Sequence, residues 1–110
     1  MVTDGTTIYA LRGDGRKDFW RYSITDNAWD EIHDTPDGIG YGGSLASDGV
    51  NIYALRGDDR KNFWIFTPNE NSWTSLPNTP KDVDGGGGLT FLNGTIYAVR
   101  GDGKKEFWDY

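Results

Sequence analysis

The sequence predicts an all-β fold, and three observations lead to that prediction. Glycine is abundant, with 16 residues among 110, which indicates frequent turns. Apolar side chains alternate between two faces along short segments such as residues 51–56, as they do in strands. Closely similar segments also recur along the chain, whereas no stretch has the periodicity of an amphipathic helix.

The recurring segment is present three times at a constant spacing. It reads IYALRGDGRKDFW from Ile8, IYALRGDDRKNFW from Ile52 and IYAVRGDGKKEFW from Ile96, so successive copies begin 44 residues apart. A fixed period of this length indicates supersecondary units that stack on one another. The chain is long enough for about two and a half such units.

Each unit is expected to form four short strands. The first covers residues 42–47, or 86–92 in the next repeat, and leads into an Asp-Gly or Asn-Gly turn. Both residue types in such turns tolerate positive φ, which makes the dipeptides typical of hairpins. The second strand is NIYALR, at residues 51–56.

The second half of each unit follows the same alternation. A charged turn, GDGRKD or its equivalents, leads to a third strand at residues 19–24 or 63–67. After a polar turn, the fourth strand begins at Trp29 or Trp73. A connection rich in proline and glycine then returns to the next first strand.

Four-stranded antiparallel units that repeat radially are the blades of a β-propeller. The sequence therefore predicts a single propeller segment over residues 1–110, with blade 1 at about 1–41, blade 2 at about 42–85 and an incomplete blade 3 at about 86–110. Such a segment is open, because two and a half blades do not complete a ring. Either a second copy closes it into a six-bladed homodimer, or missing sequence closes it.

The repeat resembles the kelch repeat over the whole chain. Kelch units have a hydrophobic strand ending in a glycine doublet, then a Tyr and a Trp at fixed offsets; here the strand is Ile52-Tyr53-Ala54-Leu55, followed by Phe66 and Trp73. Arginine replaces the first glycine of the doublet in every copy. The resemblance implies a propeller, for which six blades is a suitable number.

The same register places an Arg-Gly-Asp tripeptide between the second and third strands of each unit. Integrin-type receptors read this tripeptide when it stands at the tip of an exposed loop. A turn requires Gly for positive φ and Asp to cap the backbone, so we expect a structural role. Arg12, Arg56 and Arg100 are expected to end the second strands and to meet a carboxylate or a backbone carbonyl.

The aromatic side chains are expected to form the core between adjacent blades, since large rings stack well between sheets. Sugar stacking is the alternative role. The tryptophans assigned to the core are Trp20, Trp29, Trp64, Trp73 and Trp108. In each Phe-Trp pair the two rings point to opposite faces of the strand, so both sides of a blade receive a ring.

One face of the segment is the preferred candidate for ligand binding. The turns between second and third strands and the connections between blades are expected to share it, and loops on a rigid scaffold commonly carry function. The candidate residues are Arg12, Asp14, Arg16, Tyr41, Arg56, Asp58, Arg60, Asp82, Asp84, Arg100 and Asp102.

Composition narrows the classes of function. The net charge of −6 disfavours nucleic acid, and no apolar run is long enough to span a membrane. The chain has no cysteine and a single histidine, His33, so no zinc site of the usual kind is expected. No loop has the ligand spacing of an EF-hand and no aspartate stands out as an acid or base, so no metal, cofactor or catalytic residue is assigned. Kelch-like copper oxidases require cysteine, so their activity is not implied.

The sequence thus predicts a non-catalytic scaffold that binds a protein or another ligand through its loop face. A lectin-like, carbohydrate-binding module of the cell surface is one alternative, and a fragment of a propeller enzyme is another. Self-association into a ring is also expected. The compartment stays open, with an extracellular or cell-surface location slightly favoured.

Overall fold

A computed structural model describes residues 1–110 and contains strands but no helix. The strands are β1 (Val2–Thr3), β2 (Thr7–Leu11), β3 (Phe19–Ser23), β4 (Ala28–Ile32), β5 (Ser44–Ser47), β6 (Ile52–Leu55), β7 (Phe63–Thr67), β8 (Ser72–Leu76), β9 (Gly88–Leu92), β10 (Thr95–Val99) and β11 (Phe107–Asp109). The protein is therefore all-β, as the glycine content and the alternation predict.

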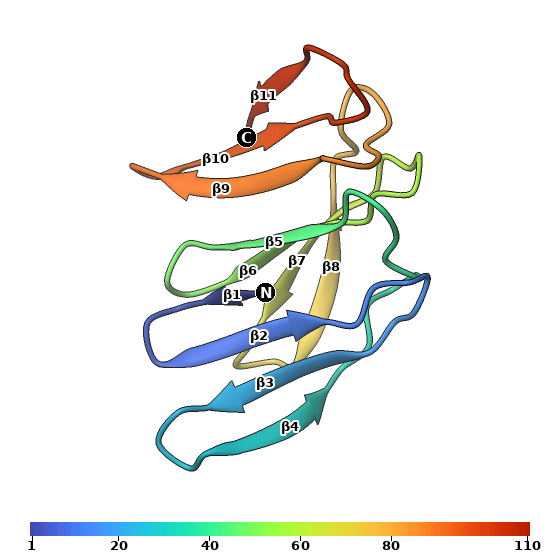
Figure 1. The fold of residues 1–110 in the computed structure, drawn as a ribbon. Coiled ribbons are helices and arrows are strands. Elements are labelled where there is room, and N and C mark those ends of the chain that lie inside the picture. The colour runs from blue at the N-terminus through green and yellow to red at the C-terminus, as the bar shows by residue number, and fades with distance from the viewer.

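The strands form three separate antiparallel sheets. Their orders are β1-β2-β3-β4, β5-β6-β7-β8 and β11-β10-β9, and we refer to them as blades 1, 2 and 3. Figure 1 shows the blades stacked along the chain, with blade 1 at the bottom and blade 3 at the top. The first strands of neighbouring blades lie against each other, β1 beside β5 and β5 beside β9. The arrangement is an open, propeller-like fold.

The strand boundaries differ from the expectation in two respects. Arg12, Arg56 and Arg100 lie one residue beyond the second strands, which end at Leu11, Leu55 and Val99. The next residue in each copy is a glycine with positive φ, which turns the backbone out of the strand. The first strands are also shorter than expected because Gly42 and Gly86 have positive φ.

The core consists of two layers, one in each space between blades. The layer between blades 1 and 2 contains Tyr9 and Phe19 from blade 1 and Ile52, Trp64 and Phe66 from blade 2. Trp73 packs against this layer, with its ring centroid 4.9 Å from that of Phe19.

The second layer lies between blades 2 and 3 and contains Leu55, Phe63, Ile96 and Ala98. Phe63 and Trp64 are neighbours on β7, yet they belong to different layers. This arrangement confirms for blade 2 that a Phe-Trp pair places a ring on both sides of the blade, because successive side chains of a strand point to opposite faces.

Not every tryptophan assigned to the core is buried. Trp64 is 2% exposed, whereas Trp29 is 56% exposed. Trp29 is the counterpart of Trp73, but no blade lies against the face of blade 1 that carries it. Trp29 stacks only on Tyr22 of its own blade, with ring centroids 5.1 Å apart. The core assignment of Trp29 was therefore wrong for the single chain.

Replacement of Trp64 by alanine tests the layer between blades 1 and 2. We expect a loss of about 3–5 kcal/mol in unfolding free energy, measured in urea, because the change leaves a large cavity. Trp20 holds the same position on blade 1 but is only partly buried. At concentrations where the chain is a single copy, the Trp20→Ala variant should therefore lose less unfolding free energy. Equal losses at the two positions would contradict this assignment of the core.

Candidate binding face

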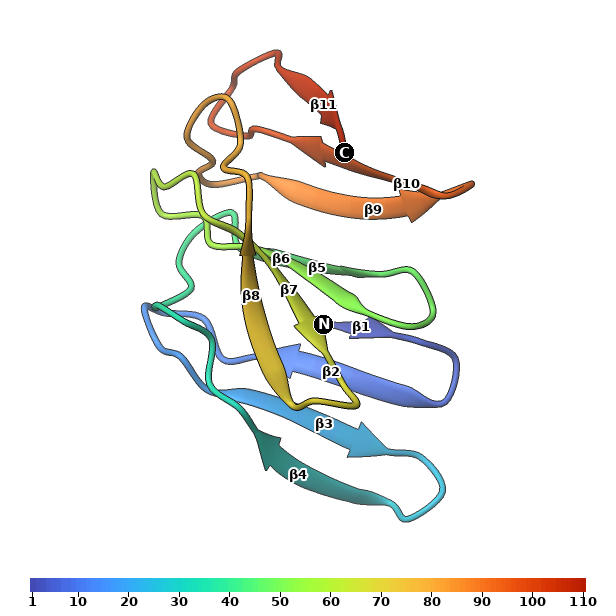
Figure 2. The ribbon, with the colours of Figure 1, turned by 180° about the vertical axis from the view of Figure 1, so that it is seen from behind.

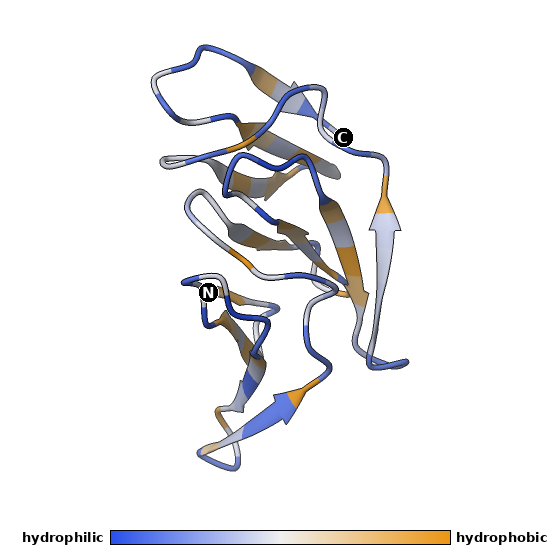
Figure 3. Ribbon diagram, turned by 90° about the vertical axis from the view of Figure 1, so that its right-hand side faces the viewer, coloured by the Kyte–Doolittle hydropathy of each residue, from blue (hydrophilic) through white to orange (hydrophobic).

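The turns and connections named by the sequence lie at one end of the blades. Figure 1 shows the β2–β3, β6–β7 and β10–β11 turns on its right-hand side, and Figure 2 shows the β4–β5 and β8–β9 connections at that same end. Figure 3 views this end directly, and most of its loops are hydrophilic. We call it the loop face. The expected placement of these segments is confirmed.

Backbone hydrogen bonds join each turn to at least one neighbouring connection. The turn after β6 receives support from both neighbours: Asp58 N donates to Tyr41 O at 2.7 Å, and Asp59 N donates to Val83 O at 3.0 Å. Arg60 also forms an isolated antiparallel bridge with Val83. The turn is thus held between two interblade connections, which restricts its motion relative to the blades.

The arginines before the turns add a second set of links. Arg56 Nε donates to Gly38 O at 3.1 Å, and its guanidinium lies 3.2 Å from the carboxylate of Asp37. Arg100 repeats the arrangement, donating to Asp82 O at 2.9 Å and pairing with the Asp82 carboxylate at 2.7 Å. Both contacts reach the connection that enters the blade. The expected carboxylate and carbonyl partners are therefore present.

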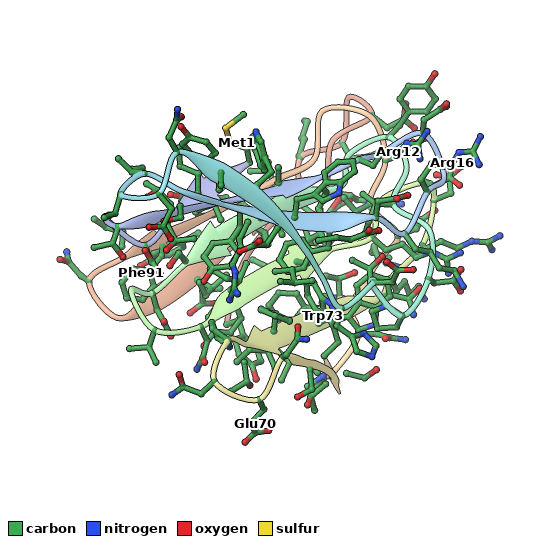
Figure 4. All side chains as sticks on the ribbon, turned by 90° about the horizontal axis from the view of Figure 1, so that it is seen from below. Met1, Arg12, Arg16, Glu70, Trp73 and Phe91 are labelled. Atoms are coloured by element: carbon green, nitrogen blue, oxygen red, sulfur yellow. The ribbon has the colours of Figure 1, made fainter.

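Arg12 lacks the equivalent link, because no connection enters blade 1. Its guanidinium meets only Asp18 of its own turn, at 3.4 Å, and its side chain is 51% exposed. The Arg56 side chain, by contrast, is only 18% exposed, and each of its three guanidinium nitrogens has an acceptor, in Gly38, Asn62 or Asp37. Figure 4 shows Arg12 at the loop-face end of the molecule, beside Arg16. Two of the three Arg-Gly-Asp copies thus use their arginine to join blades.

The other candidate residues gather around two recesses of the loop face. The first, of about 400 Å³, is lined by Asp14, Gly15, Gly40, Tyr41 and Asp58. The Tyr41 ring beside it is 79% exposed. This recess joins residues from the turns of blades 1 and 2, which are distant in the sequence.

The second recess, of about 210 Å³, is lined by Asp59, Asp82, Asp84, Arg100, Asp102 and Lys104. Asp59 and Lys104 were absent from the predicted set. Asp59 occupies the position of a glycine in the other two copies, and this difference was the signal that could have singled it out. Arg16 and Arg60 lie outside both recesses and are exposed.

The second recess is acidic, and its carboxylates affect each other. The charge of Asp84 raises the pKa of Asp59 above its ordinary value of 3.8, and Asp82 and Asp102 act in the same direction. By contrast, the hydrogen bond from Arg100 lowers the pKa of Asp82. The structure contains no group of three or more His, Asp or Glu side chains placed to hold a metal ion.

Replacing Asp84 with asparagine is expected to lower the pKa of Asp59 towards its ordinary value. The raised pKa means that the folded chain holds this proton more tightly than the unfolded chain does. The repulsion between the Asp59 and Asp84 carboxylates therefore destabilises the folded chain at neutral pH. It is relieved as the pH falls through the raised pKa of Asp59 and that group takes up a proton. The pKa of Asp59 is measured from the NMR chemical shift of its carboxyl carbon during a pH titration. Asp14→Asn, in the other recess, is the control, and an unchanged Asp59 titration in Asp84→Asn would contradict the assignment.

The fold and this face together define the class of the protein as an open, propeller-like all-β structure. No family model and no curated protein matches the chain. Among solved structures 73 chains match, including a structure of YjhT, with a TM-score of 0.75 and 20% sequence identity. The match covers 88% of this chain and 32% of YjhT, so the chain spans about a third of the length of that protein. At this identity the likeness shows the fold alone.

No helix in the structure has both the length and the apolar character needed to cross a membrane.

Proposed function

We propose that this kelch-like segment is a non-catalytic scaffold that binds a protein partner through its loop face. The observation that supports this proposal is that the backbone of the loop-face turns is hydrogen-bonded, whereas the aspartate side chains on these turns have no partner within the chain. Each turn is linked by backbone hydrogen bonds to at least one connection, and the turn after β6 to two, yet Asp14, Asp58 and Asp102 make no ion pair or side-chain hydrogen bond within the chain. Exposed polar groups on a preorganised backbone are suited to recognition, because little freedom is lost on binding.

A matched pair of variants tests this function. The first replaces Asp14, Asp58 and Asp102 with asparagine, which removes three charges and keeps the shape. The second replaces Glu70 with glutamine in the turn between β7 and β8, away from Arg12 and Arg16 of the loop face (Figure 4). Both are immobilised beside the parent chain, and retained proteins are compared. A partner lost with the first variant alone supports the proposal, and equal retention by all three chains overturns it.

A lectin-like function is the second candidate, and the exposed ring of Tyr41 favours it. Aromatic rings that stand beside polar recesses can stack on sugars, and Tyr41 borders the larger recess. Saturable binding to a glycan array that disappears in Tyr41→Ala would support the lectin. Binding that survives this change would exclude Tyr41 as the stacking platform.

We further propose that two copies close a six-bladed ring. The outer face of blade 1 has an apolar recess of about 290 Å³ lined by Ala10, Trp20 and Trp29. On the outer face of blade 3, Phe107 is 64% exposed. Between blades 1 and 2 the equivalent residues, Trp73 and Phe19, are in contact. The two outer faces are thus the two halves of an interface that the chain already forms within itself.

A further inference from the structure

The hairpin turn between β9 and β10 lies at the end of the blades opposite the loop face. Figure 1 shows it on the left-hand side, away from the β10–β11 turn. Leu92 and Thr95 are direct partners in the ladder, so Asn93 and Gly94 alone form the turn. Their φ values of 50° and 85° are both positive, as a type I′ turn requires. The Asn-Gly dipeptide therefore makes this turn through backbone conformation.

The equivalent turns of blades 1 and 2 are held by an aspartate. Asp4 Oδ1 accepts hydrogen bonds from the amides two and three residues further on, at 3.0 and 2.9 Å. Asp48 Oδ1 does the same at 2.8 and 2.7 Å. The corresponding position of blade 3 is Leu92, whose side chain has no acceptor. The backbone N–H of Gly94 consequently donates to no group of the chain.

Asparagine is a chemically labile residue, and its breakdown uses the backbone nitrogen that follows it. That nitrogen, after losing its proton, attacks the side-chain carbonyl carbon Cγ. A new C–N bond forms, and the side-chain nitrogen leaves as ammonia with the proton that the attacking nitrogen gave up. Water then opens the cyclic imide at one of its two carbonyl groups. One opening gives aspartate, and the other gives isoaspartate, in which the main chain runs through Cβ.

Three local conditions favour this reaction, and Asn93 meets all of them. Its side chain is exposed and makes no hydrogen bond, so the amide is free to turn towards the backbone. The next residue is Gly94, which has no Cβ and the widest range of backbone conformations. Nothing lies within 4 Å of a Cβ built on Gly94, so the surroundings do not restrict the turn. The attacking N–H is also unpaired, as described above.

Each of the other asparagines fails at least one condition. Three of them accept a hydrogen bond through the side-chain oxygen: Asn27, Asn62 and Asn71. The backbone amides that follow Asn69 and Asn78 donate to carbonyl groups, at 3.1 and 3.0 Å. Asn51 precedes Ile52, a β-branched residue that is 0% exposed. Asn93 is thus singled out by its turn.

We propose that Asn93 is a site of spontaneous deamidation, converted to aspartate and isoaspartate while the chain remains folded. The aspartate form adds one negative charge and leaves the main chain unchanged. The isoaspartate form adds a main-chain atom to a turn of two residues, and the turn length fixes the register of a hairpin. The Leu92–Thr95 pair therefore no longer fits, and the ends of β9 and β10 separate.

Peptide mass spectrometry after incubation of the intact chain tests the site. We expect Asn93 to lose its amide before any other asparagine, and to lose it faster as the pH is raised, because the attacking nitrogen must be deprotonated. An isoaspartate-specific carboxyl methyltransferase should transfer more methyl groups to the incubated parent than to Asn93→Gln. A sample incubated in urea gives the rate without the turn. Retention of Asn93 in the folded chain but loss in urea overturns the proposal, and so does earlier loss at another asparagine.

The variant Ser72→Gly is a control within the same molecule. It gives the β7–β8 turn an Asn-Gly dipeptide, and Asn71 there has nearly the same φ as Asn93, 49°. The side-chain oxygen of Asn71, however, accepts a hydrogen bond from the backbone N–H of His33 at 3.0 Å. Asn71 of this variant should therefore react more slowly than Asn93. Equal loss at the two positions would overturn the role given to the free turn.

Hydrogen exchange distinguishes the two products. Asn93→Asp reproduces the aspartate form and should keep the parent's protection at the amide of Thr95, whereas the separated isoaspartate form should lose it. Equal protection in the two forms would contradict the predicted opening of the hairpin. The loop-face residues take no part in these measurements, so their outcome is independent of the proposed binding function.

Discussion

Replacement of Gly42 by alanine is expected to destabilise the chain by more than about 3 kcal/mol. Gly42 has a φ of 82°, in the left-handed region that side chains disfavour, at a cost of about 1–3 kcal/mol. A Cβ atom here would also overlap with the carbonyl oxygen of Asp84, which belongs to the next connection. The backbone must therefore move at the point where blades 2 and 3 meet. Denaturant unfolding measures the loss.

Gly49 provides the matched control for Gly42. It has a similar φ of 92°, but nothing lies within 4 Å of a Cβ built on it, because it belongs to the open turn between β5 and β6. Gly49→Ala should therefore show only the conformational cost, about 1–3 kcal/mol. A loss at Gly49 as large as that at Gly42 would contradict the role given to the close approach of the two connections.

Replacement of Phe107 by lysine is expected to convert a two-copy ring into single chains. The proposed ring seats Trp29 of each copy on Phe107 of the other, so a charge at this position would be buried without a partner. Light scattering should give about twice 12.3 kDa for the parent chain and about 12.3 kDa for Phe107→Lys. The free energy of unfolding of the single chain should change little, since Phe107 is 64% exposed there.

Two further variants complete the test of ring closure by light scattering. Trp29→Glu alters the opposite half of the same interface and should also give single chains. Val50→Lys replaces an equally exposed apolar residue in the β5–β6 turn, outside both outer faces, and should keep the mass of the parent. A parent chain that has the mass of one copy at every concentration would refute ring closure by a second copy.

The loop face could be predicted because strand direction alternates along the chain. Once the repeat places the turn at residues 57–61 after a second strand, its position at the same end as the connections follows from the topology. The kind of group that Arg56 contacts was also predictable. An arginine at the end of a strand that packs between blades needs a hydrogen-bond acceptor, either a carboxylate or a backbone carbonyl. Its individual partners, Gly38 and Asp37, were not, because they depend on how far the connection bends towards the turn.

Trp29 and Trp73 show the limit of prediction from a repeat. They occupy the same position in successive units, yet one is exposed and the other packs between two blades. The repeat assigns both to the same role, whereas burial depends on whether a neighbouring blade is present. Asp59 was missed for a related reason: its perturbing neighbour Asp84 lies on the following connection and comes close only after folding.

The sequence by itself determined the strand order, the antiparallel pairing and the face on which the turns lie, since these depend on local alternation and on a period that repeats. The tertiary structure alone decided which side chains are covered, which carboxylates perturb each other and where the loop face has recesses. Those properties depend on the distance between blades, and that distance is set by ring packing and by the glycine contacts of the connections rather than by any local pattern.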